Sequence, residues 1–370
     1  MQFEPTEEQA ELRAIVREIL TRRADGPAVR RAIAGPAGYD PELWRMLCEE
    51  VGAAALAIPE EYGGAGFSRF ETHLVLEELG YSLVPSPYLG SVALAAQAIL
   101  ASGDEDACRR LLPAIADGSA LAALGWADPR GRFSPATVAA TATFDGEWHI
   151  SGEIPLVLEG HDAAIAIVIA GTDDGPRMFE LTRPEALERT STPALDPTLR
   201  FATWRMDAVP ARPLGDGDPN ALDTVRDRAL AAIASTQSGT AARGLDMTVA
   251  YAAQRVQFGR PIGSFQALKH RMADMHVKVE TSRTASRAAA WADSEDAPER
   301  AELALLAKAS CSDALSHVGS ETIQLHGGIG ITWEHDAQLV FKRAHATAQL
   351  FGTAAQQRTR AAVSLGLVVT

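Results

Sequence analysis

The chain has 370 residues, more than one ordinary hydrophobic core holds, which predicts two or three domains. Its 46% hydrophobic content supports globular packing, while abundant alanine and only 6% aromatic residues favour helix over sheet. The formal net charge of -14 argues against nucleic acid or an anionic membrane surface as the main partner.

Residues 1–118 are predicted to form a helical domain. Four helices with apolar residues at helical spacing are expected there, at Thr6–Arg23, Pro41–Val51, Arg69–Gly80 and Gly90–Ala101. A glycine-rich loop, Ile58–Ser68, interrupts the series.

The cellular location is inferred from the N-terminus and the cysteines. The first residues are charged and amphipathic, unlike a signal peptide, and no apolar run reaches the ~18 residues of a membrane span. Cys48, Cys108 and Cys311 are few and scattered, which fits a reducing cytosol and gives neither a disulfide framework nor metal-ligand spacing. We therefore expect a cytoplasmic protein without a metal site.

Residues 119–218 have the pattern of a small all-β domain, a barrel or a sandwich. Short β-branched and alternating runs predict strands at Thr137–Phe144, Glu147–Ile150, Ala163–Ala170, Met178–Leu181 and Phe201–Met206. Turn residues separate them, such as Asp145-Gly146 and Asp173-Asp174-Gly175.

Residues 219–370 are predicted to form an antiparallel helix bundle, because long helical patterns are joined by short loops. The expected helices are Leu222–Gln254, Ser264–Ala292, Glu299–Leu325, Glu334–Leu350 and one after Thr353. The predicted fold class is therefore α+β and mostly α, with three domains in the order helical, β and helical.

Two motifs at breaks in this bundle carry the functional information. In Tyr251–Gln266, YAAQRVQFGRPIGSFQ, Arg255 offers an always-charged fork suited to a pyrophosphate. In Gln324–Gly330, QLHGGIG, Gly327 and Gly328 let backbone approach a ligand closely. Together they predict one end of a dinucleotide site built from helix ends. The ordinary alternative for Arg255 is a side chain that complements a helix dipole.

This layout resembles the acyl-CoA dehydrogenase family over essentially the whole chain. The resemblance is carried by EEYGGAGFS, the central β domain, RVQFGRPIGSFQ, HGGIGIT and AQLFGTAAQQ, in that order. Within this family, these motifs are most similar to those of the non-catalytic subunit of actinobacterial heterotetrameric enzymes. Such enzymes act on steroid and other bulky acyl-CoA thioesters.

The resemblance implies an FAD site shared across a subunit interface. One protomer of such enzymes holds the isoalloxazine ring and the catalytic base, and its neighbour lends contacts to the pyrophosphate and adenosine. The lent positions are all present here in the family's form: Arg255, Gln257, Phe258, Phe265, Gln266, Gln324, Leu325, Gly327 and Gly328.

The family's catalytic base is absent from both positions where the resemblance places it. That base is a glutamate that removes an α-proton of the thioester while a hydride passes to flavin. The commoner position precedes Gly352-Thr353 and holds Phe351, and the alternative position falls on Ala229. Neither side chain takes a proton, so no catalytic residue is expected in this chain. Asp227, two residues away, lies off the helical face of Ala229.

The ring-binding half of the family's flavin site is altered too. The Thr-Glu-Pro segment becomes Ala127–Phe133, and the Trp-Ile-Thr strand becomes Leu156-Val157-Leu158. Flavin carbonyls buried against such alkyl groups would be left unpaired, at ~1–3 kcal/mol each.

The favoured hypothesis is a non-catalytic subunit of an α2β2 acyl-CoA dehydrogenase. A homologous catalytic partner would bind the acyl-CoA, and an electron-transfer flavoprotein would accept the electrons. Two alternatives stay open: a homomeric flavoprotein with an unconventional base, with His326 or Glu334 as test positions, and a flavin-free scaffold.

Overall fold

The structure is a computed structural model that describes residues 4–133 and 137–367. The chain divides into two compact units. One comprises Met1–Ala34, His73–Val84 and Leu230–Thr370, and the other comprises Gly35–Thr72 and Pro85–Ala229. The three-domain boundaries expected from the sequence stay a prediction.

The second unit is built on a small closed β-barrel. Its strands are β1 (Ala122–Gly125), β2 (Ala140–Phe144), β3 (Trp148–Leu158), β4 (Ile165–Thr172), β5 (Gly175–Leu181), β6 (Glu188–Thr192) and β7 (Phe201–Pro213). They pair in the circuit β4-β2-β3-β7-β5-β4, with β1 added to β4 and β6 added to β7. A parallel pairing of Thr141 with Gly171 completes the circuit. Of the two predicted architectures, the barrel is therefore the one present.

Both predicted turns join antiparallel strands of this barrel. Asp145-Gly146 connects β2 to β3, and the turn that ends at Gly175 connects β4 to β5. The parallel pairings of β4 with β1 and β2 were not expected from the hairpin pattern. Trp148 packs against the rings of Phe144 and Phe179, with ring centroids 5.2 and 5.3 Å away, and so contributes to the packing of the barrel.

Short helices complete this unit. They are α3 (Pro41–Glu49), η1 (Ala53–Ala55), η2 (Glu60–Tyr62), η3 (Leu89–Ala96), α5 (Gln97–Ala101), α6 (Glu105–Ala116) and η5 (Pro184–Ala186). The helix predicted over Gly90–Ala101 is present, but its first part, η3, is a π-helix whose eight residues are all buried, and it becomes α-helical only in α5. Ser91 of η3 accepts a bond from the backbone N–H of Ala122 at 2.9 Å, which ties η3 to the start of β1. Helix α6 was not predicted, since Pro113 interrupts its pattern.

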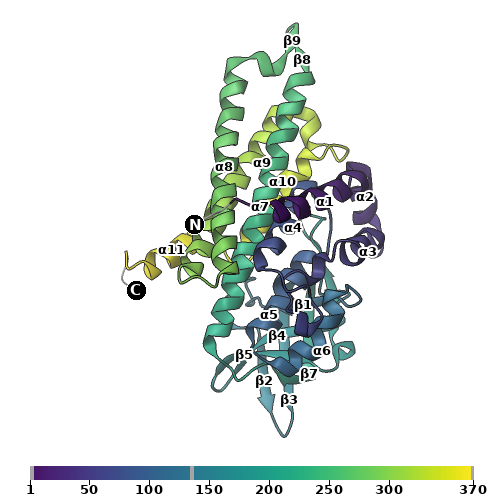
Figure 1. The fold of residues 1–370 in the computed structure, drawn as a ribbon, viewed down its shortest axis with the longest axis vertical. Helices are drawn as coiled ribbons and strands as arrows, with labels where there is room; N and C mark the ends of the chain where they lie inside the picture. Colours follow the sequence, from purple (N-terminus) through teal and green to yellow (C-terminus); the bar gives the residue numbers. More distant parts are fainter. Residues whose placement is uncertain (1–3, 134–136, 368–370) are drawn as a thin grey trace. The chain divides into compact units, whose positions relative to one another are not determined.

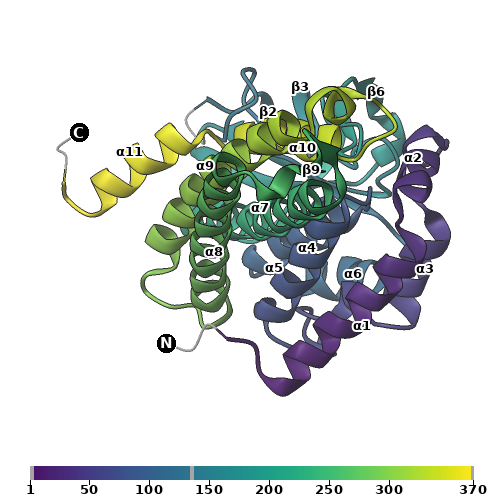
Figure 2. The ribbon, with the colours of Figure 1, turned by 90° about the horizontal axis from the view of Figure 1, so that it is seen from above.

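The first unit is a helix bundle with a helical N-terminal arm (Figure 1). Its elements are α1 (Glu7–Arg23), α2 (Gly26–Ala34), most of α4 (Arg69–Ser82), α7 (Pro219–Gln254) from Leu230 onward, β8 (Val256–Gln257), β9 (Arg260–Pro261), η6 (Ile262–Ser264), α8 (Gln266–Ser294), α9 (Arg300–His326), η7 (Gly327–Ile331), α10 (Ala337–Gln349) and α11 (Ala354–Ser364). Figure 2 shows α7 to α10 packed side by side and α11 leaving the bundle on one side. The predicted bundle is confirmed.

Helix α2 was not predicted from the sequence. It opens with Gly26-Pro27, a pair that usually marks a break. Proline is tolerated in a first helical turn because its missing N–H would have no partner there. The carboxylate of Asp25 accepts a bond from the backbone N–H of Ala28 at 2.8 Å, which stabilises the start of α2.

The bundle core depends on a very close approach of α4 to α7. A Cβ placed on Gly239 would lie 1.8 Å from the carbonyl oxygen of Glu77, and one on Gly80 would lie 2.2 Å from that of Thr236. Only glycine allows two helix backbones to approach this closely. Leu315, Val318, Leu339 and Val340 belong to the buried cluster of the same bundle.

The helices differ from membrane-spanning segments. Within residues 4–133 and 137–367, none of them combines the length and the apolarity that a membrane crossing requires.

Candidate functional site at the end of the bundle

The first predicted motif forms an exposed β-hairpin between α7 and α8. Val256 pairs with Pro261 and Gln257 with Arg260, so Phe258 and Gly259 form a two-residue turn. Both turn residues have positive φ, 53° and 76°, as a type I′ turn requires. Figure 1 shows this hairpin beyond the ends of the two long helices.

The hairpin presents its functional side chains to solvent. Phe258 is 92% exposed, and Arg255 and Gln257 are also exposed. An aromatic ring this exposed is unusual for a side chain that serves only packing. The ring of Phe265 meets that of Phe258 edge-on at 6.1 Å and lies 4.0 Å from the guanidinium of Arg260. These contacts order the hairpin without covering Phe258.

The second predicted motif ends α9 and continues into η7. Gly327 has a φ of +64°, and a Cβ on Gly327 or Gly328 would meet no atom within 4 Å. Gln324 is exposed, whereas Leu325 is 7% exposed and belongs to the core, so only its backbone is available to a ligand. No side chain of this chain therefore packs against these two glycines, and the space beside them is open to solvent. At the start of α8, Gln266 is exposed and approaches His270 at 3.4 Å.

A stack of three rings brings the two motifs to the same end of the bundle. Tyr251, in the last turn of α7, stacks on His326, in the last turn of α9, with ring centroids 4.5 Å apart. His335 packs on the other histidine at 4.6 Å. The ring Nδ1 of His326 donates to the carbonyl of Thr322 at 2.7 Å, and burial lowers the pKa of this histidine. These contacts give His326 a packing role.

Three further apolar side chains of these loops are exposed, although the sequence did not predict them as site residues. Val256 is 54% exposed, Ile331 72% and Trp333 45%. Large exposed apolar side chains such as these are candidates for contact with another molecule. The available signal was the presence of large apolar residues inside glycine-rich loops, where solvent-facing polar residues are usual.

Both predicted base positions hold buried apolar side chains. Phe351 and Ala229 are each 0% exposed. Near Phe351, the ammonium of Lys308 donates to the carbonyl oxygens of Ala348 and Gly352 at 3.3 and 3.4 Å. Burial lowers the pKa of Lys308 to about 8. The segment before Gly352 is thus held by a buried lysine and offers no carboxylate.

The segment expected to face a flavin ring is filled by the protein itself. The side chain of Leu156 lies so close to Gly131 that a Cβ there would be 2.7 Å from its Cδ1. The carboxylate of Asp128 accepts bonds from the backbone N–H groups of Arg130 and Arg132, both at 2.8 Å. Its other oxygen accepts from the guanidinium of Arg132 at 2.9 Å and from the hydroxyl of Thr137 at 3.2 Å. Val157 and Leu158 are buried and apolar.

The described residues thus combine a helical N-terminal region, a small barrel and a helix bundle, and one end of the bundle carries an exposed arginine, an aromatic ring and open glycines. Residues 6–119 match the model of the acyl-CoA dehydrogenase N-terminal domain, and residues 225–366 match that of the C-terminal domain. The chain belongs to the acyl-CoA dehydrogenase family, whose members are FAD-dependent oxidoreductases.

Individual relatives cover nearly the whole chain. Acyl-CoA dehydrogenase IpdE2 of Mycolicibacterium smegmatis is 42% identical over 355 residues, which cover 96% of this chain and 98% of the relative. A variant of the Tcur3481-Tcur3483 steroid ACAD has a TM-score of 0.88 and 31% identity, with 98% of this chain and 99% of that chain covered. The ChsE4-ChsE5 complex from Mycobacterium tuberculosis has a TM-score of 0.90 and 28% identity, with both chains fully covered.

Proposed function

We propose that this chain is the non-catalytic subunit of a heteromeric FAD-dependent acyl-CoA dehydrogenase. FAD supplies hydride acceptance in the α,β-dehydrogenation of acyl-CoA thioesters. This chain lends contacts to the pyrophosphate and adenosine of that FAD, through Arg255, Gln257, Phe258, Phe265, Gln266, Gln324, Leu325, Gly327 and Gly328. A homologous partner supplies the glutamate base, the ring-binding barrel and the acyl pocket, in an α2β2 assembly.

The observation that carries this proposal is Phe351 at the usual position of the base. Abstraction of a weakly acidic α-proton needs a proton acceptor within hydrogen-bond reach. A phenylalanine that is 0% exposed offers none, and neither does Ala229. A chain with this substitution needs the base of another subunit to turn over substrate.

The exposed hairpin supports the other half of the proposal. Arg255 provides a planar donor fork of the kind that binds phosphate oxygens in pairs. Phe258 is 92% exposed and gives an aromatic face on which a base or ring stacks. Gly327 and Gly328 leave space in which a ligand meets backbone N–H groups. Side chains this exposed are available to a site on a neighbouring molecule.

The relatives favour a two-subunit assembly and a bulky substrate. ChsE4-ChsE5 is named as a complex of two proteins, and Tcur3481-Tcur3483 is named as a steroid enzyme. We extend both properties to this chain, with a steroid-type or other bulky acyl-CoA as the substrate of the complex. An electron-transfer flavoprotein is the proposed electron acceptor.

The test is co-expression with a glutamate-bearing homologue, followed by flavin quantitation for the complex and for the chain alone. We expect one FAD for each pair of subunits in the complex and no flavin reduction by acyl-CoA in the isolated chain. Arg255→Ala should raise the FAD dissociation constant of the complex at least tenfold. The control Arg22→Ala removes an arginine that is 67% exposed on α1, and FAD affinity should stay unchanged.

Two results would contradict the proposal. One is an isolated chain that holds a full complement of FAD and reduces it with an acyl-CoA, as the homomeric alternative requires. The other is a complex whose FAD content is indifferent to Arg255→Ala, as a flavin-free scaffold requires.

A further inference from the structure

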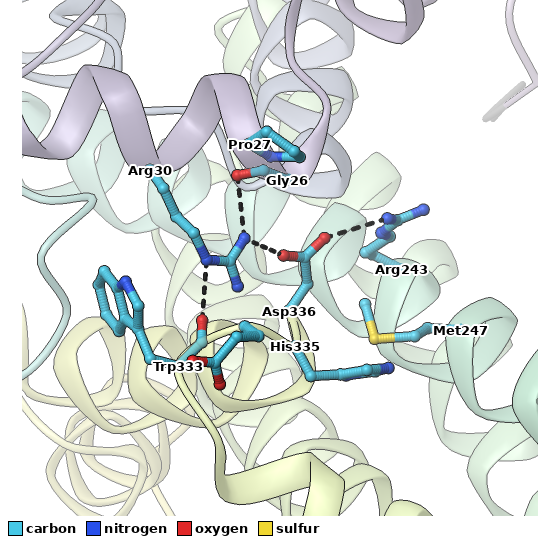
Figure 3. Close-up of a pocket in the computed structure, with 9 residues that line it drawn as sticks. Gly26, Pro27, Arg30, Arg243, Met247, Trp333, His335 and Asp336 are labelled. Atoms are coloured by element: carbon cyan, nitrogen blue, oxygen red, sulfur yellow. Dashed lines mark hydrogen bonds and ion pairs between the residues drawn. The ribbon is translucent and has the colours of Figure 1, made fainter.

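The segment Trp333–Asp336 connects the glycine-rich η7 to α10. It is hydrogen-bonded to the N-terminal helix α2. The two meet at a cavity of about 500 Å³, which is also lined by Arg243 and Met247 of α7 (Figure 3). All of these residues belong to the bundle unit. The contacts of α2 therefore lie at the C-terminal end of the loop that contains Gly327 and Gly328.

Arg30 of α2 makes three hydrogen bonds at this cavity, two of them to the segment Trp333–Asp336. Its Nε donates to the carbonyl of Trp333 at 2.8 Å, and one terminal nitrogen donates to Asp336 at 2.7 Å. The same nitrogen donates to the carbonyl of Gly26 at 2.9 Å. The guanidinium also lies 5.7 Å from the ring of Trp333. A single side chain thus fixes both the backbone and the carboxylate of the segment.

Asp336 does not cap α10 with its side chain, although its position predicts that it should. It is the N-cap residue of α10, where an aspartate normally accepts a bond from the helix backbone. Here its side chain makes no cap bond and reaches Arg30 on one side and Arg243, at 3.6 Å, on the other. The ring Nδ1 of His335 instead accepts the backbone N–H of Ala337 at 3.1 Å. The carboxylate is therefore available to connect α2, α7 and α10.

Gly26 permits this arrangement. A Cβ at this position would lie 2.8 Å from a carboxylate oxygen of Asp336 and 3.0 Å from Arg30. A side chain here would therefore displace the carboxylate of Asp336 or the guanidinium of Arg30 from the observed contact.

The charges of the cavity favour an internal clamp over a ligand site. Arg30 and Arg243 face two carboxylates, those of Asp336 and the exposed Glu334. The cavity therefore has no excess of either charge with which to select an ionic ligand. The ring of Trp333 has a second cationic neighbour besides Arg30, since the ammonium of Lys342 lies 5.2 Å from it.

We propose that Arg30 is a positioning residue for the flavin-contact loop: through Trp333 and Asp336 it holds Gly327–Ile331 in the conformation that receives the FAD of the partner. This inference rests on the proposed function, because it concerns the loop that lends those contacts. The ring stack of Tyr251, His326 and His335 anchors the start of the loop, and Arg30 anchors its end.

The test compares Arg30→Gln and Asp336→Asn with Arg31→Gln in the full heteromeric complex. Arg31 is an exposed neighbour on α2, so its substitution removes the same charge from the same helix. For the first two variants we expect an FAD dissociation constant raised at least tenfold, with kcat per bound FAD unchanged at saturating FAD. Hydrogen exchange in residues 327–336 of the full-length chain should accelerate in both variants. Arg31→Gln should match the unaltered complex in each measurement.

The outcomes separate this inference from the proposed function. If Arg255→Ala loses FAD but Arg30→Gln and Asp336→Asn keep both the original dissociation constant and slow exchange, the positioning role is wrong and the proposed function stands. If Arg255→Ala also keeps its FAD, the proposed function itself fails. A general loss of folding would accelerate exchange throughout the bundle, and confinement to 327–336 in the isosteric Asp336→Asn chain excludes that explanation.

Discussion

At the scale of single residues, the segment before Gly352 is held by a buried cation. Lys308 is 0% exposed and donates to the hydroxyl of Ser312 at 2.9 Å and to two backbone carbonyls near Phe351. None of these three acceptors is a carboxylate, and burial lowers the pKa of the ammonium to about 8. Burial of an ammonium without an opposite charge opposes folding, so at neutral pH this residue holds its segment in place at a cost in stability.

The pH dependence of stability tests this account of Lys308. Because the folded pKa is lower than the ordinary value of 10.5, the unfolded chain binds more protons between the two values. The contribution of Lys308 to the free energy of unfolding should therefore rise with pH, by about 2 kcal/mol between roughly pH 7.5 and 9.5. Chemical denaturation of the original chain and Lys308→Met at both pH values measures this difference.

The matched control for this prediction is Lys278→Met, which removes an exposed lysine of α8. Its pH dependence should parallel that of the original chain. The assigned direction would be contradicted if the free energy of unfolding of the original chain, relative to that of Lys308→Met, stayed constant or fell as the pH rises.

At the scale of elements, the contact of α4 with α7 and the hairpin between α7 and α8 differ in whether side chains are buried or exposed. The first is a close backbone contact in which side chains are excluded, as Gly239 shows. The second is a strand pair whose side chains face solvent. The contact holds the bundle together, and the hairpin is available for a neighbouring molecule.

Alanine at Gly239 should therefore destabilise the bundle strongly. Its Cβ would lie 1.8 Å from the carbonyl oxygen of Glu77, and the two helices would have to separate. Overpacking of this kind costs typically about 1–3 kcal/mol, and we expect the upper end or more because backbone rather than a side chain is in the way. Thermal and chemical denaturation measure the loss.

Gly328→Ala is the paired control for this effect. Nothing lies within 4 Å of a Cβ at this position, so folding stability should change little. If the two alanine variants lost the same stability, close contact of α4 with α7 would not explain the glycine at position 239.

At the scale of the whole molecule, the proposed assembly shares one ligand between two subunits. A ligand that binds the associated state better than the separated state must strengthen association by the same factor by which association strengthens ligand binding. FAD should therefore act as a link between this chain and its partner.

The dissociation constant of the two subunits should accordingly fall when FAD is added. At FAD concentrations about 100 times its dissociation constant, linkage predicts about 2.7 kcal/mol, or roughly hundredfold tighter association. Sedimentation of the flavin-depleted and reconstituted complexes measures the shift, and Arg255→Ala should reduce it. Identical association with and without FAD would argue against a shared site.

Much of the element order is predictable from sequence because long helices and tight turns have strong local signals. The bundle helices end where glycine or proline breaks the pattern, and Asp145-Gly146 marks a hairpin turn. Elements with weak local signals were missed: α2 begins with Gly26-Pro27, and α6 contains Pro113. The π-helix η3 has the same apolar composition as an α-helix, and its difference lies in backbone hydrogen bonding.

The candidate site likewise contains residues that the sequence identifies and residues that only the fold identifies. Arg255, Phe258, Gly327 and Gly328 stand out by residue type and spacing, but their exposure depends on how the chain folds. Arg30 gave no sequence signal, since its partner Asp336 is 306 positions away. Contacts over such separations follow from packing of whole helices and have no local pattern.

The sequence by itself determined that positions 351 and 229 take no part in proton transfer, because phenylalanine and alanine accept no proton in any fold. It also determined where long helices begin and end, since those limits follow from local backbone preferences. Only the tertiary structure decided that Tyr251 meets His326, that Arg30 meets Asp336 and that Phe258 stands in solvent. The physical reason is that burial and long-range contact are properties of packed elements, which no short stretch of sequence contains.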